Sequence, residues 1–160
     1  MIMSVNQKNI LTKKNNVHFW LQIAFFLLPF IIYFNTIGHG YALDDAIVIT
    51  HNQYTKKGLA GLKDIFLNDS FKGFYQEKTV YLPGGRYRPL SIATFAVEKE
   101  FFGLNPHISH LVNILIYAFT GLLLFRLLRL LAYEKNTTPK HLYFAAFSVL
   151  IFMVHPVHTE

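Results

Sequence analysis

The chain has 160 residues, of which 52% are apolar and 16 are phenylalanine, and it carries a formal net charge of +6. Such an apolar share, gathered into long runs, is typical of membrane proteins and excludes an ordinary soluble domain. The excess of Lys and Arg lies at the ends of the apolar runs rather than on one soluble face, which argues against binding of nucleic acid. No cysteine is present, so disulfides cannot hold any part of the chain.

The first predicted element is a membrane-spanning helix over residues 18–37. Its run from Phe19 to Phe34, FWLQIAFFLLPFIIYF, has no charged residue and is, with residues 35–37, long enough to cross about 30 Å of hydrocarbon. Lysines in residues 1–17 place that segment in the cytoplasm, because short basic segments stay on the cytoplasmic side. A cleaved signal peptide is the alternative, with Gly40-Tyr41-Ala42 as a poor cleavage site.

Residues 38–107 are predicted to form an external loop that is too long to be a linker. Apolar residues recur in it at helical spacing twice, at about residues 58–68 and 89–102. The second of these helices would begin at Pro89, a favourable first-turn residue, and end before Gly103. Both helices are expected to lie in the membrane interface with their apolar faces toward the lipid.

Two further spans are predicted over residues 108–130 and 141–155. The first contains the uncharged run from Leu111 to Phe125, and the second is barely long enough to cross. The basic connection at residues 131–140 belongs in the cytoplasm, and residues 156–160 begin a second external loop. The predicted fold class is therefore an all-α membrane protein with three transmembrane helices and a long external loop that carries interfacial amphipathic helices.

The acidic pair Asp44 and Asp45 follows the first span by a short tether, near the outer membrane surface. Two adjacent acids are costly there, because like charges raise one pKa unless a cation neutralises them. The pair is a candidate general base or metal ligand that faces a membrane-borne substrate. A solvated turn, or a helix N-cap, is the structural alternative.

Arg86 and Arg88 stand at the start of the second loop helix. A guanidinium group binds phosphate oxygens bidentately, and a helix N-terminus adds its partial positive charge. These arginines are therefore candidates for binding a phosphate. Attraction to anionic lipid head groups explains them equally well.

Histidines mark the outer ends of the last two spans. His107, His110 and Asn113 follow one another at i, i+3 and i+6 and form one polar stripe, which faces a cavity or hydrogen-bonds a neighbouring helix. His155, His158 and Glu160 follow the last span. The two histidines and the glutamate could bind a divalent metal, but the set is weak because no third ligand of known geometry accompanies the histidines. No cofactor is therefore assigned, and binding of a divalent metal stays an open possibility.

Four segments in this order resemble those of a known family. They are the acidic pair after the first span, YRPLSIATF in the loop, HLVNILIYA at the start of the second span and HPVHTE after the third. From about residue 41 to residue 160 the chain is similar to the transmembrane and TPR-repeat-containing O-mannosyltransferases and their bacterial relatives, within the GT-C class of membrane glycosyltransferases. The order of the four segments is specific, whereas any one of them alone is weak. Members of this family continue into further spans and often a TPR array, so the resemblance implies an N-terminal fragment that is inactive alone.

The resemblance implies transfer of a mannose-like sugar from a polyprenyl-phosphate donor to a hydroxyl of a protein or glycan, with inversion. It places the acidic pair of the class at Asp44 and Asp45, with Asp44 favoured as the base that takes the acceptor proton and Asp45 as its support. Arg86 or Arg88 would stabilise the leaving phosphate, and His155 and His158 are second candidates for that task. The residues expected to line the substrate pocket are His107, His110, Asn113 and Glu160.

The expected partners are thus a lipid-linked sugar donor, a hydroxyl acceptor and the bilayer. The expected location is a bacterial inner membrane, or the endoplasmic reticulum in a eukaryote. Two alternatives stay open from the residues. One is a transporter or flippase subunit whose polar residues line a path, and the other is a non-catalytic membrane scaffold.

Overall fold

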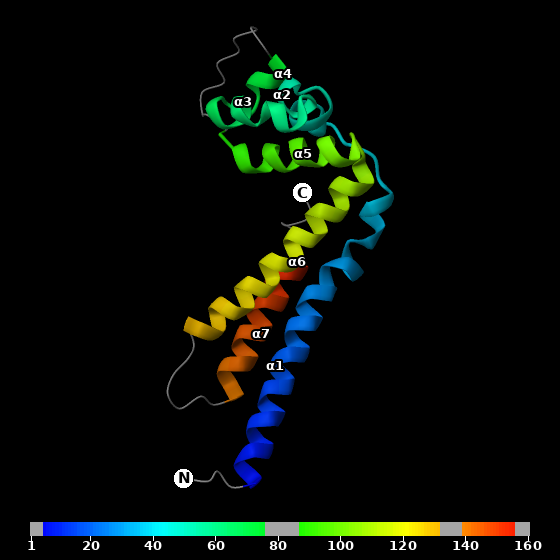
Figure 1. Ribbon diagram of the computed structural model, residues 1–160. Helices are drawn as coiled ribbons and strands as arrows, with labels where there is room; N and C mark the ends of the chain where they lie inside the picture. The colour runs from blue at the N-terminus through cyan, green and yellow to red at the C-terminus, as the bar shows by residue number, and fades with distance from the viewer. Residues whose placement is uncertain (1–4, 76–86, 132–138, 156–160) are drawn as a thin grey trace. The chain divides into compact units, whose positions relative to one another are not determined.

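A computed structural model describes residues 5–75, 87–131 and 139–155 (Figure 1). Every regular element in these ranges is a helix, which confirms the all-α class expected from the sequence. The chain divides into two compact units. Residues 1–35 and 113–160 form the three-helix unit, and residues 36–112 form the loop unit.

The three-helix unit consists of α1 (Val5–Ile32), the part of α6 (Pro106–Leu131) from Asn113 onward, and α7 (Pro139–Val154). These helices run alongside one another in Figure 1, with α7 packed against α1. Their common core is made of apolar side chains from all three helices: Phe25, Phe125, Ala145, Val149 and Met153. Gly121 of α6 permits a close approach, since a Cβ atom there would lie 2.6 Å from the methyl carbon of Met153.

Helix α6 alone, among the described residues, is both long and apolar enough to cross a membrane. The apolar helical stretches Asn16–Ile32 and Lys140–Val154 are shorter than a typical span. Length and composition thus support one of the three expected spans, and the other two stay predictions. The α-helical part of the first segment also ends at Ile32 instead of continuing to residue 37.

A short 3-10 helix, η1 (Phe34–Gly38), follows α1 and includes Asn35, Thr36 and Gly38. These residue types have low helix propensity, which explains why the α-helix does not continue through them. The acidic pair therefore begins further from the end of the α-helix than the sequence suggested.

The loop unit is built from short helices that pack on one longer helix. In chain order these are η2 (Ala46–Thr50), α2 (Gln53–Lys56), η3 (Gly58–Gly61), α3 (Leu62–Leu67), α4 (Lys72–Tyr75) and α5 (Pro89–Phe102). Helix α5 contacts η2, α2, η3 and α3, and Ile65, Ile92 and Ala96 are buried between them (Figure 1). The two helices expected in the loop correspond to η3 with α3, and to α5.

Asn52 organises the centre of the loop unit. It is fully buried, and its side-chain Nδ2 donates to the carbonyl oxygens of Ile47 at 3.0 Å and of Ser70 at 3.1 Å. Its Oδ1 accepts from the backbone N–H of Tyr54 at 3.0 Å and so caps α2. One amide therefore fastens η2, α2 and the turn before α4 to each other, and no long hydrophobic periodicity is needed to hold these short elements.

Candidate functional site

The acidic pair lies in a tight turn between η1 and η2. The backbone N–H of Ala42 donates to Oδ2 of Asp45 at 2.7 Å, and the N–H of Asp45 donates back to the carbonyl oxygen of Ala42 at 3.1 Å. The side chain of Asp44 is exposed and makes no hydrogen bond or ion pair with any described residue. The Asp45 carboxylate thus closes the turn, and the Asp44 carboxylate is presented to the surroundings.

Tyr41, next to this turn, connects it to the corner between α5 and α6. The phenol oxygen of Tyr41 lies 3.2 Å from Oγ of Ser109, and that hydroxyl donates to Oε2 of Glu98 at 2.6 Å. Glu98 is 7% exposed and Ser109 is 5% exposed. Burial raises the pKa of the Glu98 carboxyl, and the hydrogen bond from Ser109 opposes part of that rise.

Sequence reasoning did not single out Tyr41, Glu98 or Ser109. Nothing in the spacing along α5 distinguishes the buried Glu98 from the exposed Glu100 two residues later. Glu98 is buried near the start of α6, where Ser109 donates to its carboxylate, and the two helices are separated by the break at Gly103, which has a φ of 71°. Only tertiary structure reveals that this acid is enclosed.

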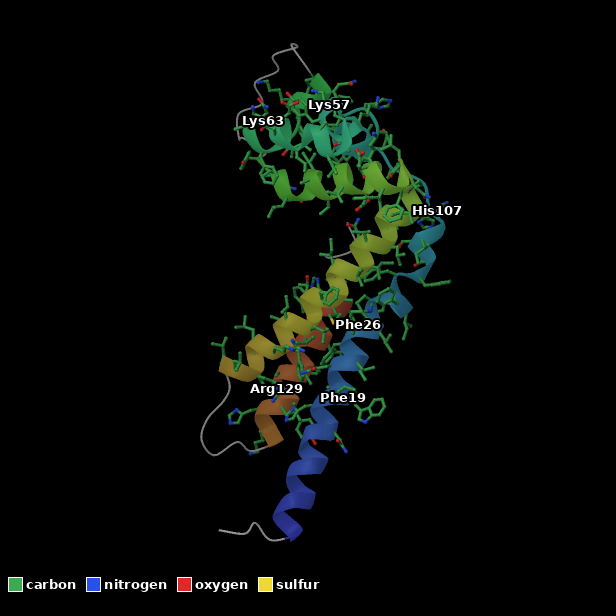
Figure 2. All side chains as sticks on the ribbon, viewed as in Figure 1. Phe19, Phe26, Lys57, Lys63, His107 and Arg129 are labelled. Carbon is green, nitrogen blue, oxygen red and sulfur yellow. The ribbon has the colours of Figure 1, made fainter. Side chains whose placement is uncertain are left out.

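The polar stripe on α6 is divided among different environments. His107, labelled in Figure 2, places its ring Nδ1 2.6 Å from the carbonyl oxygen of Ile37, so it holds the segment ahead of the acidic pair. His110 has a buried Nε2 without a hydrogen-bond partner in the described part of the chain. Asn113 is exposed. His107 is therefore a structural contact, and His110 is a polar side chain that its present neighbours do not satisfy.

Arg88 precedes the first residue of α5, as the sequence predicted. Its backbone N–H donates to Oγ of Ser70 at 2.9 Å, and its side chain is exposed. Next to it, the Tyr87 hydroxyl donates to the carbonyl oxygen of Phe66 at 2.7 Å. The backbone of this arginine is thus fixed while its guanidinium group stays accessible at a helix N-terminus, which suits an anion.

The remaining candidates fall elsewhere. His155 is exposed and directly follows α7, whereas Arg86, His158 and Glu160 lie outside the described residues. Asp44, Arg88, His107 and His110 belong to the loop unit, while Asn113 and His155 belong to the three-helix unit. A common site made of residues from both units stays a prediction. Within the described ranges, no three His, Asp or Glu side chains cluster closely enough to hold a metal ion.

Comparison with known proteins gives a consistent set of relatives. The chain is 32% identical over 117 residues to human protein O-mannosyl-transferase TMTC1, a match that covers 73% of this chain and 12% of the relative. It is 27% identical over 128 residues to human TMTC3, covering 80% of the chain and 13% of the relative. With Drosophila melanogaster Tmtc3 it shares 32% identity over 143 residues, covering 81% of the chain and 15% of the relative.

The chain therefore spans only 12% to 15% of the length of these curated relatives. No family model matches it, and no solved structure matches it. The relatives confirm the resemblance that the four sequence segments indicated.

Proposed function

Because this chain belongs with the transmembrane and TPR-repeat-containing O-mannosyltransferases over about three quarters of its length, we propose that it forms part of a membrane glycosyltransferase of the GT-C class. The proposed reaction moves a mannose-like sugar from a polyprenyl phosphate to a protein hydroxyl. The names of the relatives support the sugar and the protein acceptor. The lipid-linked donor is proposed on the strength of the expected membrane setting and the family resemblance.

Asp44 is the proposed general base, and one observation carries this assignment. Of the two adjacent acids, Asp45 is engaged in closing the turn, whereas the Asp44 carboxylate is exposed and has no partner among the described residues. A general base must reach a substrate proton, and a carboxylate that already accepts a hydrogen bond from the backbone is poorly placed to do so. Asp45 supports Asp44 by fixing the turn that presents it.

The proposed step is a single inverting displacement. The Asp44 carboxylate takes the proton of the acceptor hydroxyl as that oxygen attacks the anomeric carbon from the face opposite the phosphate. The bond between the anomeric carbon and the phosphate oxygen breaks, and its electron pair leaves with the phosphate. Arg88, with Arg86, stabilises the charge that develops there, so no general acid is required.

The proposed membrane arrangement places the loop unit outside and the N-terminus in the cytoplasm. Lysines at the start of the chain and basic residues between α6 and α7 support this orientation. Leu90, Val97 and Phe101 are exposed at i, i+7 and i+11 on α5. These exposed apolar side chains suit a lipid interface. Ile92 and Ala96, which the sequence also places on the apolar face of this helix, are instead buried within the loop unit.

The test is a transfer assay with the purified full-length protein in lipid vesicles and a serine- and threonine-containing acceptor peptide. The radiolabelled donor is dolichyl-phosphate mannose, with GDP-mannose as the matched control. We expect label to enter the peptide from the lipid donor and not from the nucleotide. Transfer from GDP-mannose alone would refute the proposed donor. Movement of the lipid donor across the vesicle membrane without any transfer would indicate the flippase alternative.

A further inference from the structure

The carboxylate of Glu98 is enclosed in the loop unit without a cation to balance it. Glu98 makes no ion pair with a described residue, and its Oε1 is buried with no hydrogen-bond partner there. Enclosing an acid in this way is unfavourable unless its charge is used in an interaction that a neutral side chain would make less well. The one described interaction of this carboxylate is with Ser109.

The hydrogen bonds that link Tyr41, Ser109 and Glu98 all donate toward the Glu98 carboxylate. A hydroxyl has a single proton, and at 2.6 Å the proton of Ser109 is committed to the Glu98 carboxylate. The Tyr41 hydroxyl, 3.2 Å from Ser109 Oγ, must then donate to Ser109. The ionised acid therefore orders the chain Tyr41 to Ser109 to Glu98, in which each hydroxyl donates to the next group.

This chain of hydrogen bonds ends next to the acidic pair. Tyr41 directly precedes Ala42, whose N–H donates to Asp45 in the turn that presents Asp44. Four residues before Tyr41, the carbonyl oxygen of Ile37 contacts the ring of His107. The segment that leads into the acidic turn is thus held to the start of α6 by two contacts, one between Ile37 and His107 and one between Tyr41 and Ser109. Glu98 orients the second contact through its hydrogen bond with Ser109.

We infer that Glu98, acting through Ser109 and Tyr41, is a positioning residue that holds the turn bearing Asp44 and Asp45. The inference deepens the proposed function, because it concerns the same acidic pair. Its structural part does not depend on whether the protein transfers a sugar.

The structural part is tested with a spin label. This chain has no cysteine, so one introduced at Leu43, which is 93% exposed within the turn, labels this segment at a single position. Leu67→Cys at the end of α3, 70% exposed, is the reference label in the same unit. The full-length protein in lipid vesicles is compared with its Glu98→Gln, Ser109→Ala and Tyr41→Phe variants by electron paramagnetic resonance.

We expect each variant to mobilise the label at position 43 and to leave the label at position 67 unchanged. Combining Tyr41→Phe with Glu98→Gln should add little to either change alone, because both interrupt one chain of hydrogen bonds. Glu100→Gln is the matched control, since Glu100 accepts from the N–H of Leu59 and not from Ser109. Equal mobility at position 43 in Glu98→Gln and Glu100→Gln would overturn the inference, as would equal loosening at both labels.

The activity part separates the inference from the proposed function. Misplacing a reacting group by about 1 Å lowers a rate by up to about 100-fold, so Tyr41→Phe should reduce kcat by roughly tenfold or more with little change in KM for the lipid donor. A label at position 43 that is restrained in the wild type and mobilised in the variants, in a protein that transfers no sugar, would refute the proposed function and leave the positioning intact. Normal kcat in Tyr41→Phe, in a protein that does transfer sugar, would refute the positioning.

Discussion

Asp44 and Asp45 are neighbours in the chain but differ in what their carboxylates contact. The carboxylate of Asp45 accepts a hydrogen bond from the backbone three residues earlier, and the carboxylate of Asp44 is exposed. This difference comes from the turn geometry and not from residue type, which is identical. It supports the proposed division of tasks, in which Asp45 fixes the turn and Asp44 takes the proton.

Glu98 should make the stability of the protein depend on pH. Burial raises the pKa of this carboxyl, so the folded protein holds its proton more tightly than the unfolded chain does. The associated stability is fully present below the pKa of an unfolded glutamate and is lost as pH rises through the higher folded pKa. Glu98→Gln stays neutral, so its unfolding temperature should fall less than that of the wild type as the pH rises above about 4.

Thermal unfolding of the purified protein in detergent across this pH range measures the effect. Glu100→Gln is the control, because Glu100 is exposed. Parallel pH dependences for the wild type and Glu98→Gln would show that burial of Glu98 does not govern its ionisation.

The residues of the candidate site could be predicted from the sequence only in part. Asp44, Asp45, Arg88 and His110 stand out by residue type and by their positions near a predicted span or at the start of a predicted helix. Glu98 does not, because its burial is created by the start of α6, which lies several residues later in the chain. His107 was expected in the substrate pocket, whereas the structure engages its ring with the carbonyl oxygen of Ile37.

At the scale of elements, two helical glycines pack against neighbours that differ in how easily they can move aside for an added methyl group. A Cβ atom on Gly73 of α4 would clash with Oδ1 of the buried Asn52, and one on Gly121 of α6 would meet the flexible end of Met153. Alanine gains similar helix propensity at both positions, so the contacts decide the difference. Gly73→Ala should lower the free energy of unfolding by about 1–3 kcal/mol, and Gly121→Ala by less.

Thermal or denaturant unfolding of the two variants, side by side in one detergent, checks this order. A larger loss in Gly121→Ala would show that the contact between α6 and α7 is the stiffer one. Asn52 would then not be the fixed point of the loop unit.

The exposed face of α5 should meet lipid. An environment-sensitive fluorophore on a cysteine at position 101 should report an apolar surrounding and be quenched by brominated lipids, because Phe101 is 68% exposed and follows Leu90 and Val97 on one face. The same fluorophore at position 63, where the exposed Lys63 of α3 is labelled in Figure 2, is the reference. Equal quenching at positions 101 and 63 would contradict the interfacial placement of α5.

Elements with long hydrophobic periodicity could be read from the sequence, and short ones could not. The spacing of apolar residues after Pro89 predicts α5 over the range where it occurs. Helices α2 and α4 are each four residues long and too short for any periodicity. They depend on buried hydrogen bonds, chiefly those of Asn52, which no local pattern reveals.

At the scale of the whole molecule, the chain combines an apolar three-helix unit with a loop unit that carries the acidic pair. The sequence predicts that the two units meet the membrane so that Asp44, Arg88 and His155 face the same outer surface. This convergence depends on a membrane and on the relative placement of the units, which short-range sequence patterns do not encode. It stays a prediction, as do the three spans and their orientation.

The measurement that tests the central claim most directly is sugar transfer by the full-length Asp44→Asn protein. Asparagine keeps the size of the side chain and removes the base, so transfer from dolichyl-phosphate mannose should fall on the order of 10²- to 10⁴-fold while donor binding persists. Asp69→Asn is the control, because Asp69 is an exposed acid that accepts from the backbone N–H of Phe71 at 2.9 Å, a bond that asparagine also makes. That variant should transfer normally. Transfer that survives both Asp44→Asn and Asp45→Asn within a few-fold would contradict the account.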